Sequence, residues 1–336
     1  MVVTTPSIPP RARSPDVMLD SGKATMEPNI ANVVLGNLLI KPWYQSFYPE
    51  ELVGKRTERL ADALLDAYGG FGAFRPSMDW EGMLMRRSKK VCLQKDKTPP
   101  GCVIYEKDEH AVHELDGEDH QLYTQNLSLF AKLFLETKSV FYDVTTFRYY
   151  TLVHTDPGTS QSQVVGFFSK EKMSWDDNNL ACILVFPPWQ KRGLGQILMG
   201  LSYELGRKEG RLGGPERPLS ALGRRGYMAF WSAAIYRYIL SVPTKRSLTV
   251  RTLSEAIWIM PDDVIAALKE MEVVDFRTNK ATPKLKGATL DKWIRKEVMG
   301  PSIDKARVKA WGLANGVSLV PPVDVNAFVE DEEMGQ

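Results

Sequence analysis

Cysteine is scarce in this chain of 336 residues, which contains only Cys92, Cys102 and Cys182. Three cysteines exclude a disulfide scaffold, and their scarcity fits a reducing compartment. No C-x-x-C pair is present, so the ligand spacing of a typical structural zinc site is missing as well. We therefore expect a protein that folds by burying apolar side chains, without structural zinc.

Long apolar runs and an excess of charge of one sign are also missing. No stretch approaches the roughly 20 apolar residues that a membrane span needs, and residues 1–10 lack the apolar core of a secretory signal. Lysine and arginine number 43 against 41 aspartates and glutamates, a net charge of +2. A chain this close to neutrality has no global field for nucleic acid, so such contact would need a local basic patch.

What is present predicts a mixed α+β chain of two or three compact units, at about 100–200 residues per domain. Residues 1–30 carry five prolines and no apolar period, which predicts a disordered leader. Alternating or continuous apolar segments predict strands at 33–35, 38–40, 102–116 (a meander), 140–144, 147–154, 164–168 and 180–186. Helical spacing predicts helices at 57–68, 123–136, 194–208, 229–240, 262–271, 289–298 and 303–314.

The segment beyond residues 243–247 has the signals of a helix-turn-helix-like unit. Thr252 and Glu255 have the spacing of a capping box for a short helix, and Pro261 fits the first turn of the next one. That second helix carries four acidic residues against Lys269 alone, which is a poor match for phosphate contacts. A DNA-binding role for this unit is therefore the weakest of the functional hypotheses.

The most informative local feature is the segment 190–196, QKRGLGQ, which follows the apolar run LACILVF and opens a helix. Glycines at such a turn let backbone N–H groups approach an anion, and a helix N-terminus adds about half a positive charge. The segment lacks the Lys-Ser/Thr of a P-loop and the third glycine of a dinucleotide fingerprint. It is therefore interpreted as a phosphate cradle of another kind.

Cys182, in the strand before it, is either a small buried hydrophobe or a thiol close to a bound thioester.

At this point the sequence resembles the MYST family of histone lysine acetyltransferases over residues 33–275. The central stretches are VGFFSKEK (164–171), NNLACILVFPPWQKRGLGQIL (178–198), SYELGRKEGRLGGPERPLSALGRRGY (202–227) and FWS (230–232). PWYQSFYPEE (42–51), PPG (99–101), ELDG (114–117), YTQNLSLFAKLFLETKSVFYDV (123–144) and DDVIAAL (262–268) match the family's order.

The resemblance implies an acetyl-CoA-binding core of the N-acetyltransferase type between family-specific N- and C-terminal units. On it we place a leader at 1–30, an N-terminal unit at 31–120, the catalytic core at 121–242, a helical unit at 243–325 and an acidic tail at 326–336. It also implies a nuclear enzyme that acts on histone tails, with histone four as the expected substrate. Its expected partners are nucleosomes and the subunits of a chromatin-modifying complex.

The same resemblance assigns roles to residues. Glu216 matches the general base, Cys182 the active-site cysteine and Lys138 the autoacetylated lysine. The cofactor contacts would come from Ile183, Leu184, Val185, Gln190, Lys191, Arg192, Gly193, Leu194, Gly195, Gln196 and Ser220.

The chemistry agrees with these residue types. A lysine ammonium has a pKa of about 10.4 and must lose a proton before it attacks a thioester. A partly desolvated carboxylate can remove that proton, and Glu216 is the candidate, with Glu204 as the competing carboxylate. The sequence leaves open whether Cys182 takes the acetyl group transiently or only packs beside the cofactor.

The departures from the family are also informative. Between Glu51 and Pro99 the family's zinc finger is reduced to Cys92, and Cys102, His110 and His113 lack finger spacing. Ser128 replaces a family cysteine. No chromatin-reading module precedes the core, which suggests the small, fungal-type silencing branch, and the alternative function is a catalytically weak scaffold in a silencing complex.

Overall fold

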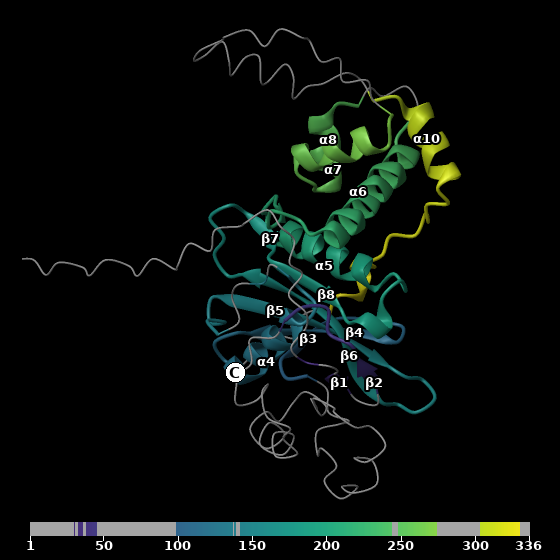
Figure 1. Ribbon diagram of the computed structural model, residues 1–336. Helices are drawn as coiled ribbons and strands as arrows, with labels where there is room; N and C mark the ends of the chain where they lie inside the picture. Colours follow the sequence, from purple (N-terminus) through teal and green to yellow (C-terminus); the bar gives the residue numbers. More distant parts are fainter. Residues whose placement is uncertain are drawn as a thin grey trace, which may run out of the picture.

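The computed structural model describes residues 30, 33–35, 38–45, 99–136, 138, 142–243, 248–273 and 303–329. They form the expected α+β fold, with an antiparallel sheet at the centre and a group of helices beside it (Figure 1). Within this part of the chain, no helix is long and apolar enough to cross a membrane. The predicted leader up to residue 29, the helices 57–68 and 289–298 and the acidic tail from residue 330 lie outside the described residues.

The central sheet has the strand order β3-β4-β5-β6-β8, and all neighbours pair antiparallel. Its strands are β3 (Cys102–Lys107), β4 (His110–Asp116), β5 (Phe147–Thr155), β6 (Ser162–Glu171) and β8 (Cys182–Val185). This confirms the meander and the two strands that follow it. A separate hairpin pairs β1 (Val33–Leu35) with β2 (Leu38–Ile40), also as predicted.

Two strand predictions are wrong. Residues 142–144 belong to no strand, because the carbonyl of Val144 accepts the N–H of Phe147 (3.1 Å) in a turn rather than in a ladder. The run 180–186 is also not one strand. It is split into β7 (Asn178–Leu180) and β8, and β7 pairs in parallel with β9 (Gly214–Pro215) whereas β8 pairs with β6.

The helices are α4 (Gln121–Lys132), α5 (Leu194–Lys208), α6 (Ala221–Ser241), α7 (Val250–Ile257), α8 (Pro261–Glu270) and α10 (Lys305–Ala314). α6 begins earlier than predicted because the side chain of Ser220 caps it, accepting the N–H of Gly223 at 3.0 Å. The capping box of α7 is formed by Thr249 and Thr252, not by Thr252 and Glu255. Glu255 instead pairs with Arg251 (2.8 Å) on the exposed side of the helix.

Two hydrophobic clusters form the core, and α5 contributes to both. Leu194, Leu198 and Leu201 pack with the sheet, whereas Met199 and Tyr203 pack with α6, α7, α8 and α10. In Figure 1, the long helix α6 leads from the sheet to these outer helices, and the chain after α10 runs back to the sheet. There the ring of Phe328 contacts the ring of Tyr105 on β3, with centroids 5.5 Å apart.

The predicted division of the chain into units, with boundaries at residues 30, 120, 242 and 325, stays a prediction.

Candidate active site

The pairing of β7 with β9 ends at Leu180, and the two expected catalytic residues, Glu216 and Cys182, lie where the two chain segments separate. The carbonyl of Leu180 at the end of β7 accepts the backbone N–H of Glu216 at 2.8 Å. Beyond this bond the chain turns at Ala181, whose N–H donates to Ser169 of β6 at 2.7 Å, and Cys182 begins β8. We call this parting of the strands the fork. The split of the predicted strand is therefore what brings Cys182 and Glu216 to one place.

Lys138 reaches the same place from the segment after α4. Its Nζ donates to the Sγ of Cys182 at 3.7 Å, and the lysine is only 7% exposed. The resemblance had named Lys138 and Cys182 for separate reasons, and the fold brings them into contact. The amine and the thiol are therefore within contact distance of each other at the fork.

The electrostatic environment of Glu216 suits a proton acceptor. Partial burial of its carboxyl raises the pKa above its usual value, and the negative charge of Glu171 at the end of β6 raises it further. The positive charge of Lys138 opposes both effects. A raised pKa makes a carboxylate a stronger base, so the shift favours removal of a proton from an amine.

Two further residues of the site, Glu171 and Tyr149, were missed by sequence reasoning. Glu171 acts on Glu216 as described above. Tyr149 of β5 shares a hydrogen bond with Ser128 of α4 (2.9 Å), and burial raises the pKa of Tyr149 to about 12, with a smaller contribution from its neighbour Cys182. Ser128 thus has a buried partner where the family has a cysteine. Strand alternation could have placed Tyr149 on an inward face, but nothing local signalled its neighbours.

The first turn of α5 is open on the side that would face an anion. Gly193 caps the helix at a φ of +83°, and a Cβ added to it would meet nothing within 4 Å. A Cβ on Gly195 would find only the Cγ2 of Val185, at 3.9 Å. Lys191 and Arg192 are exposed immediately before this turn. An accessible backbone, a helix N-terminus and two cations fit the pyrophosphate of acetyl-CoA.

The edge of β8 away from β6 offers backbone groups that fit an extended amide chain. Phe186 donates its N–H to Val165 of β6 (2.9 Å), and hydrogen-bonding direction alternates along an antiparallel strand. Leu184 therefore also faces β6, whereas Ile183 and Val185 direct their groups to the outer edge. The side-chain amide of Gln190 accordingly donates to the carbonyl of Val185 at 2.8 Å. Of the three residues expected to line the pantetheine, two thus have backbone groups on the edge of β8 that pairs with no other strand among the described residues.

The remaining predicted contacts already have structural roles. The amide of Gln196 donates to the carbonyl of Gly226 (3.1 Å), Ser220 caps α6, and the side chain of Leu194 is buried. Leu194 can therefore offer a ligand its backbone N–H only. The competing carboxylate, Glu204, lies on α5 near Arg207 (3.8 Å).

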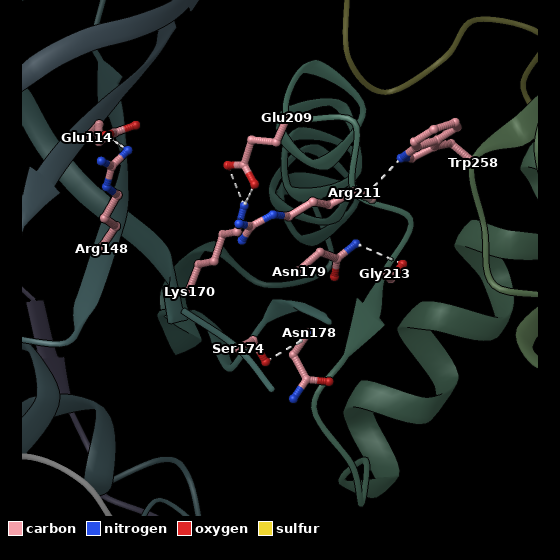
Figure 2. A network of polar contacts seen from close by, with 10 residues as sticks. All are labelled: Glu114, Arg148, Lys170, Ser174, Asn178, Asn179, Glu209, Arg211, Gly213 and Trp258. Carbon is pink, nitrogen blue, oxygen red and sulfur yellow. Dashed lines mark hydrogen bonds and ion pairs between the residues drawn. The ribbon is translucent and has the colours of Figure 1, made fainter. Parts of the chain in front are cut away.

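A polar network holds the segment that leads into β9 (Figure 2). Nζ of Lys170 pairs with Glu209 at 2.5 Å, so the end of β6 is joined to the end of α5. The indole of Trp258 donates to the carbonyl of Arg211 (3.0 Å), and the amide of Asn179 donates to Gly213 (3.3 Å). These contacts fix the residues just before Glu216, so the position of its carboxylate depends on β6, α5 and the C-terminal helices together.

No group of three or more metal-binding side chains occurs among the described residues. Cys102 is exposed at the start of β3, and Cys92 lies outside this part of the chain. The expectation that the protein lacks structural zinc stays a prediction.

The antiparallel sheet, the glycine-capped helix α5 at its edge, and the carboxyl and thiol at the fork fit an acetyl-CoA-binding fold of the N-acetyltransferase class. Residues 98–309 match the family model of the MOZ/SAS family. The chain belongs to this family, which confirms the resemblance found in the sequence.

Several curated relatives match most of the chain. "Histone acetyltransferase MOF" of Drosophila melanogaster is 37% identical over 247 residues, which cover 74% of this chain and 28% of that protein. "Putative MYST-like histone acetyltransferase 1" of Oryza sativa subsp. japonica is 36% identical over 261 residues (76% and 54%). "Histone acetyltransferase ESA1" of Gibberella zeae is 36% identical over 262 residues (75% and 49%). The chain thus spans about half or less of the length of these relatives.

Proposed function

We propose that this protein is a nuclear histone lysine acetyltransferase, which transfers the acetyl group of acetyl-CoA to a lysine amine of a histone tail, with histone four as the expected substrate. The observation that carries the proposal is the meeting of Glu216, Cys182 and Lys138 at the fork, beside the free edge of β8. Family membership and the names of the relatives support the reaction and the substrate class.

In this proposal Glu216 accepts a proton from the substrate ammonium, and the neutral amine then attacks the thioester carbonyl. The backbone N–H of Ile183, which points to the free edge of β8, can donate to the oxygen that becomes negative. The carbon–sulfur bond breaks, and the leaving thiolate takes up the proton that the attacking nitrogen loses as it becomes an amide. In a covalent variant, the Sγ of Cys182, which lies 3.7 Å from Nζ of Lys138, carries the acetyl group before the amine does.

The proposal includes Lys138 as a site of autoacetylation, because its amine is buried beside the reacting groups. Acetylation would remove the positive charge that lowers the pKa of Glu216, and would therefore make the base stronger. The expected partners are nucleosomes and the subunits of a chromatin-modifying complex. Strong direct DNA binding is not expected, because Asp263 and Glu270 of α8 are acidic and pair with arginines of this chain.

The test is acetyl transfer from labelled acetyl-CoA to nucleosomes by the protein purified with its native partners. The wild type and Glu204→Gln, the matched control on α5, should both label histones. Glu216→Gln should lose about 10²–10⁴-fold in turnover, as expected for a general base. A wild-type complex that binds acetyl-CoA but labels no histone would overturn the enzyme proposal and favour the scaffold.

A further inference from the structure

Two of the three acidic residues of α8 pair with arginines of this chain, and the third, Asp262, is exposed. Asp263 in the first turn pairs with Arg217, and Glu270 in the last turn pairs with Arg224 of α6 at 2.8 Å. Both arginines belong to the stretch that begins just after Glu216 and runs into α6. Two acidic side chains of α8 are therefore paired with the segment that carries the proposed base.

Asp263 contacts this segment on both sides of Glu216. Its carboxylate forms the ion pair with Arg217, the residue that follows Glu216. The same carboxylate lies against Gly214, where an added Cβ would be 3.0 Å from Oδ2. One side chain from α8 thus touches the chain two residues before the base and one residue after it. On the opposite side, the N–H of Glu216 is bonded to Leu180 (2.8 Å), so the base is held between β7 and α8.

A buried carboxylate in this position destabilises the fold, so packing alone does not account for an acidic residue here. Asp263 is 3% exposed, and its neighbours include the buried hydroxyls of Tyr203 and Tyr227, whose pKa values its charge helps to raise. Burial raises the pKa of Asp263 to about 6, although Arg217 opposes the shift. A pKa above that of the unfolded chain means that the charged form weakens the fold at neutral pH. Removing one partner of an ion pair is costly where it leaves the other charge buried. The Arg217 side chain is 54% exposed, so the loss of Asp263 would leave its charge in water.

Resting on the function proposed above, we infer that Asp263 is a positioning residue for Glu216, and that α8 acts on catalysis through the ion pair with Arg217. The contact sets where the carboxylate of Glu216 lies relative to the fork. Displacement of a reacting group by about 1 Å can cost as much as 10²-fold in rate. The C-terminal unit therefore influences catalysis through Asp263, without touching the substrate.

The test compares Asp263→Asn, which keeps the shape and removes the charge, with Glu270→Gln as the matched control on the same helix. In the complex with its partners, Asp263→Asn should lower kcat by about 10–100-fold with the KM for acetyl-CoA unchanged, whereas Glu270→Gln should keep both. Arg217→Gln removes the other partner of the pair and should reproduce the loss if Asp263→Asn folds poorly.

Two readouts separate positioning from a general structural role. In the Glu216→Gln background, Asp263→Asn should cause no further loss of rate, because its effect passes through Glu216. Hydrogen exchange in the free protein should speed up in the peptide 212–220, where the N–H of Glu216 is protected in the wild type, and not elsewhere in the core.

The inference is overturned if Asp263→Asn and Arg217→Gln keep the wild-type kcat while Glu216→Gln is inactive, or if the losses are additive with Glu216→Gln. This failure differs from that of the proposed function. If the function is wrong, wild type and Glu216→Gln will not differ in transfer at all.

Discussion

The first turn of α5 gives a prediction in which protein stability and ligand affinity change in opposite directions. Gly195 lies in the helix with ordinary backbone angles, and an added Cβ would make only a van der Waals contact with Val185 at 3.9 Å. Alanine is better than glycine in a helix by about 0.5–1 kcal/mol. Gly195→Ala should therefore raise the melting temperature, by about 1–3 °C for a protein of this size.

The same methyl group occupies the space through which the pyrophosphate of acetyl-CoA would approach the backbone. A hydrogen bond from an N–H to a charged group contributes about 1.5–3 kcal/mol, and each 1.4 kcal/mol is about tenfold in affinity. Gly195→Ala should therefore weaken acetyl-CoA binding by about 10–100-fold, measured by calorimetry on the purified protein. Gly195→Ala would therefore melt at a higher temperature than the wild type and bind acetyl-CoA more weakly.

Gly193, in the proposed cradle, and Gly210, outside it, provide a second test variant and its matched control. Both have left-handed backbone angles, φ +83° and +68°, and a Cβ on either would meet nothing within 4 Å. Alanine at such an angle costs about 1–2 kcal/mol, so both variants should melt at a lower temperature by similar amounts. Only Gly193→Ala should also bind acetyl-CoA more weakly, because Gly210 lies beyond the other end of α5. Unchanged affinity in both Gly193→Ala and Gly195→Ala would refute the phosphate cradle.

Three other predictions concern the base, the metal and the packing of the C-terminal helix. The turnover of the wild type should fall as the pH is lowered through the raised pKa of Glu216, because a base must be unprotonated. The pH–rate profile of Glu216→Gln should lack this fall at low pH. Its loss of turnover relative to the wild type should shrink at high pH, where the substrate lysine is deprotonated without a base. Metal analysis of protein purified without chelator should find well under one zinc per chain, and a stoichiometric amount would show that Cys92, Cys102 and histidines assemble a site. Gly312→Ala should lower the free energy of unfolding by about 1–3 kcal/mol because its Cβ would overlap the ring of Tyr236, whereas Leu313→Ala, at an exposed side chain, should melt like the wild type.

The sequence by itself determined those elements whose signals are local. The helix expected at 194–208 is α5 with the same bounds, because a glycine at its start, leucines at helical spacing and basic residues at its end are all readable along the chain. The strands β5 and β6 and the hairpin of β1 and β2 were predictable for the same reason. The identity of the site residues came from the family's motifs, since composition and spacing alone left Glu216 and Cys182 with ordinary structural interpretations.

Only the tertiary structure decided how the run 180–186 is divided and what meets at the division. An apolar run shows that its residues are buried, but not that β7 and β8 pair with different strands. The contacts around the site join residues far apart in the chain, 44 positions for Lys138 and Cys182 and 46 for Arg217 and Asp263. Hydrophobic periodicity specifies which face of each element is buried. It carries no information about which charged side chain of another element that face contacts. The pKa of Glu216 and the position of its carboxylate are therefore properties of the folded chain, set by burial and by charges that only packing brings within reach.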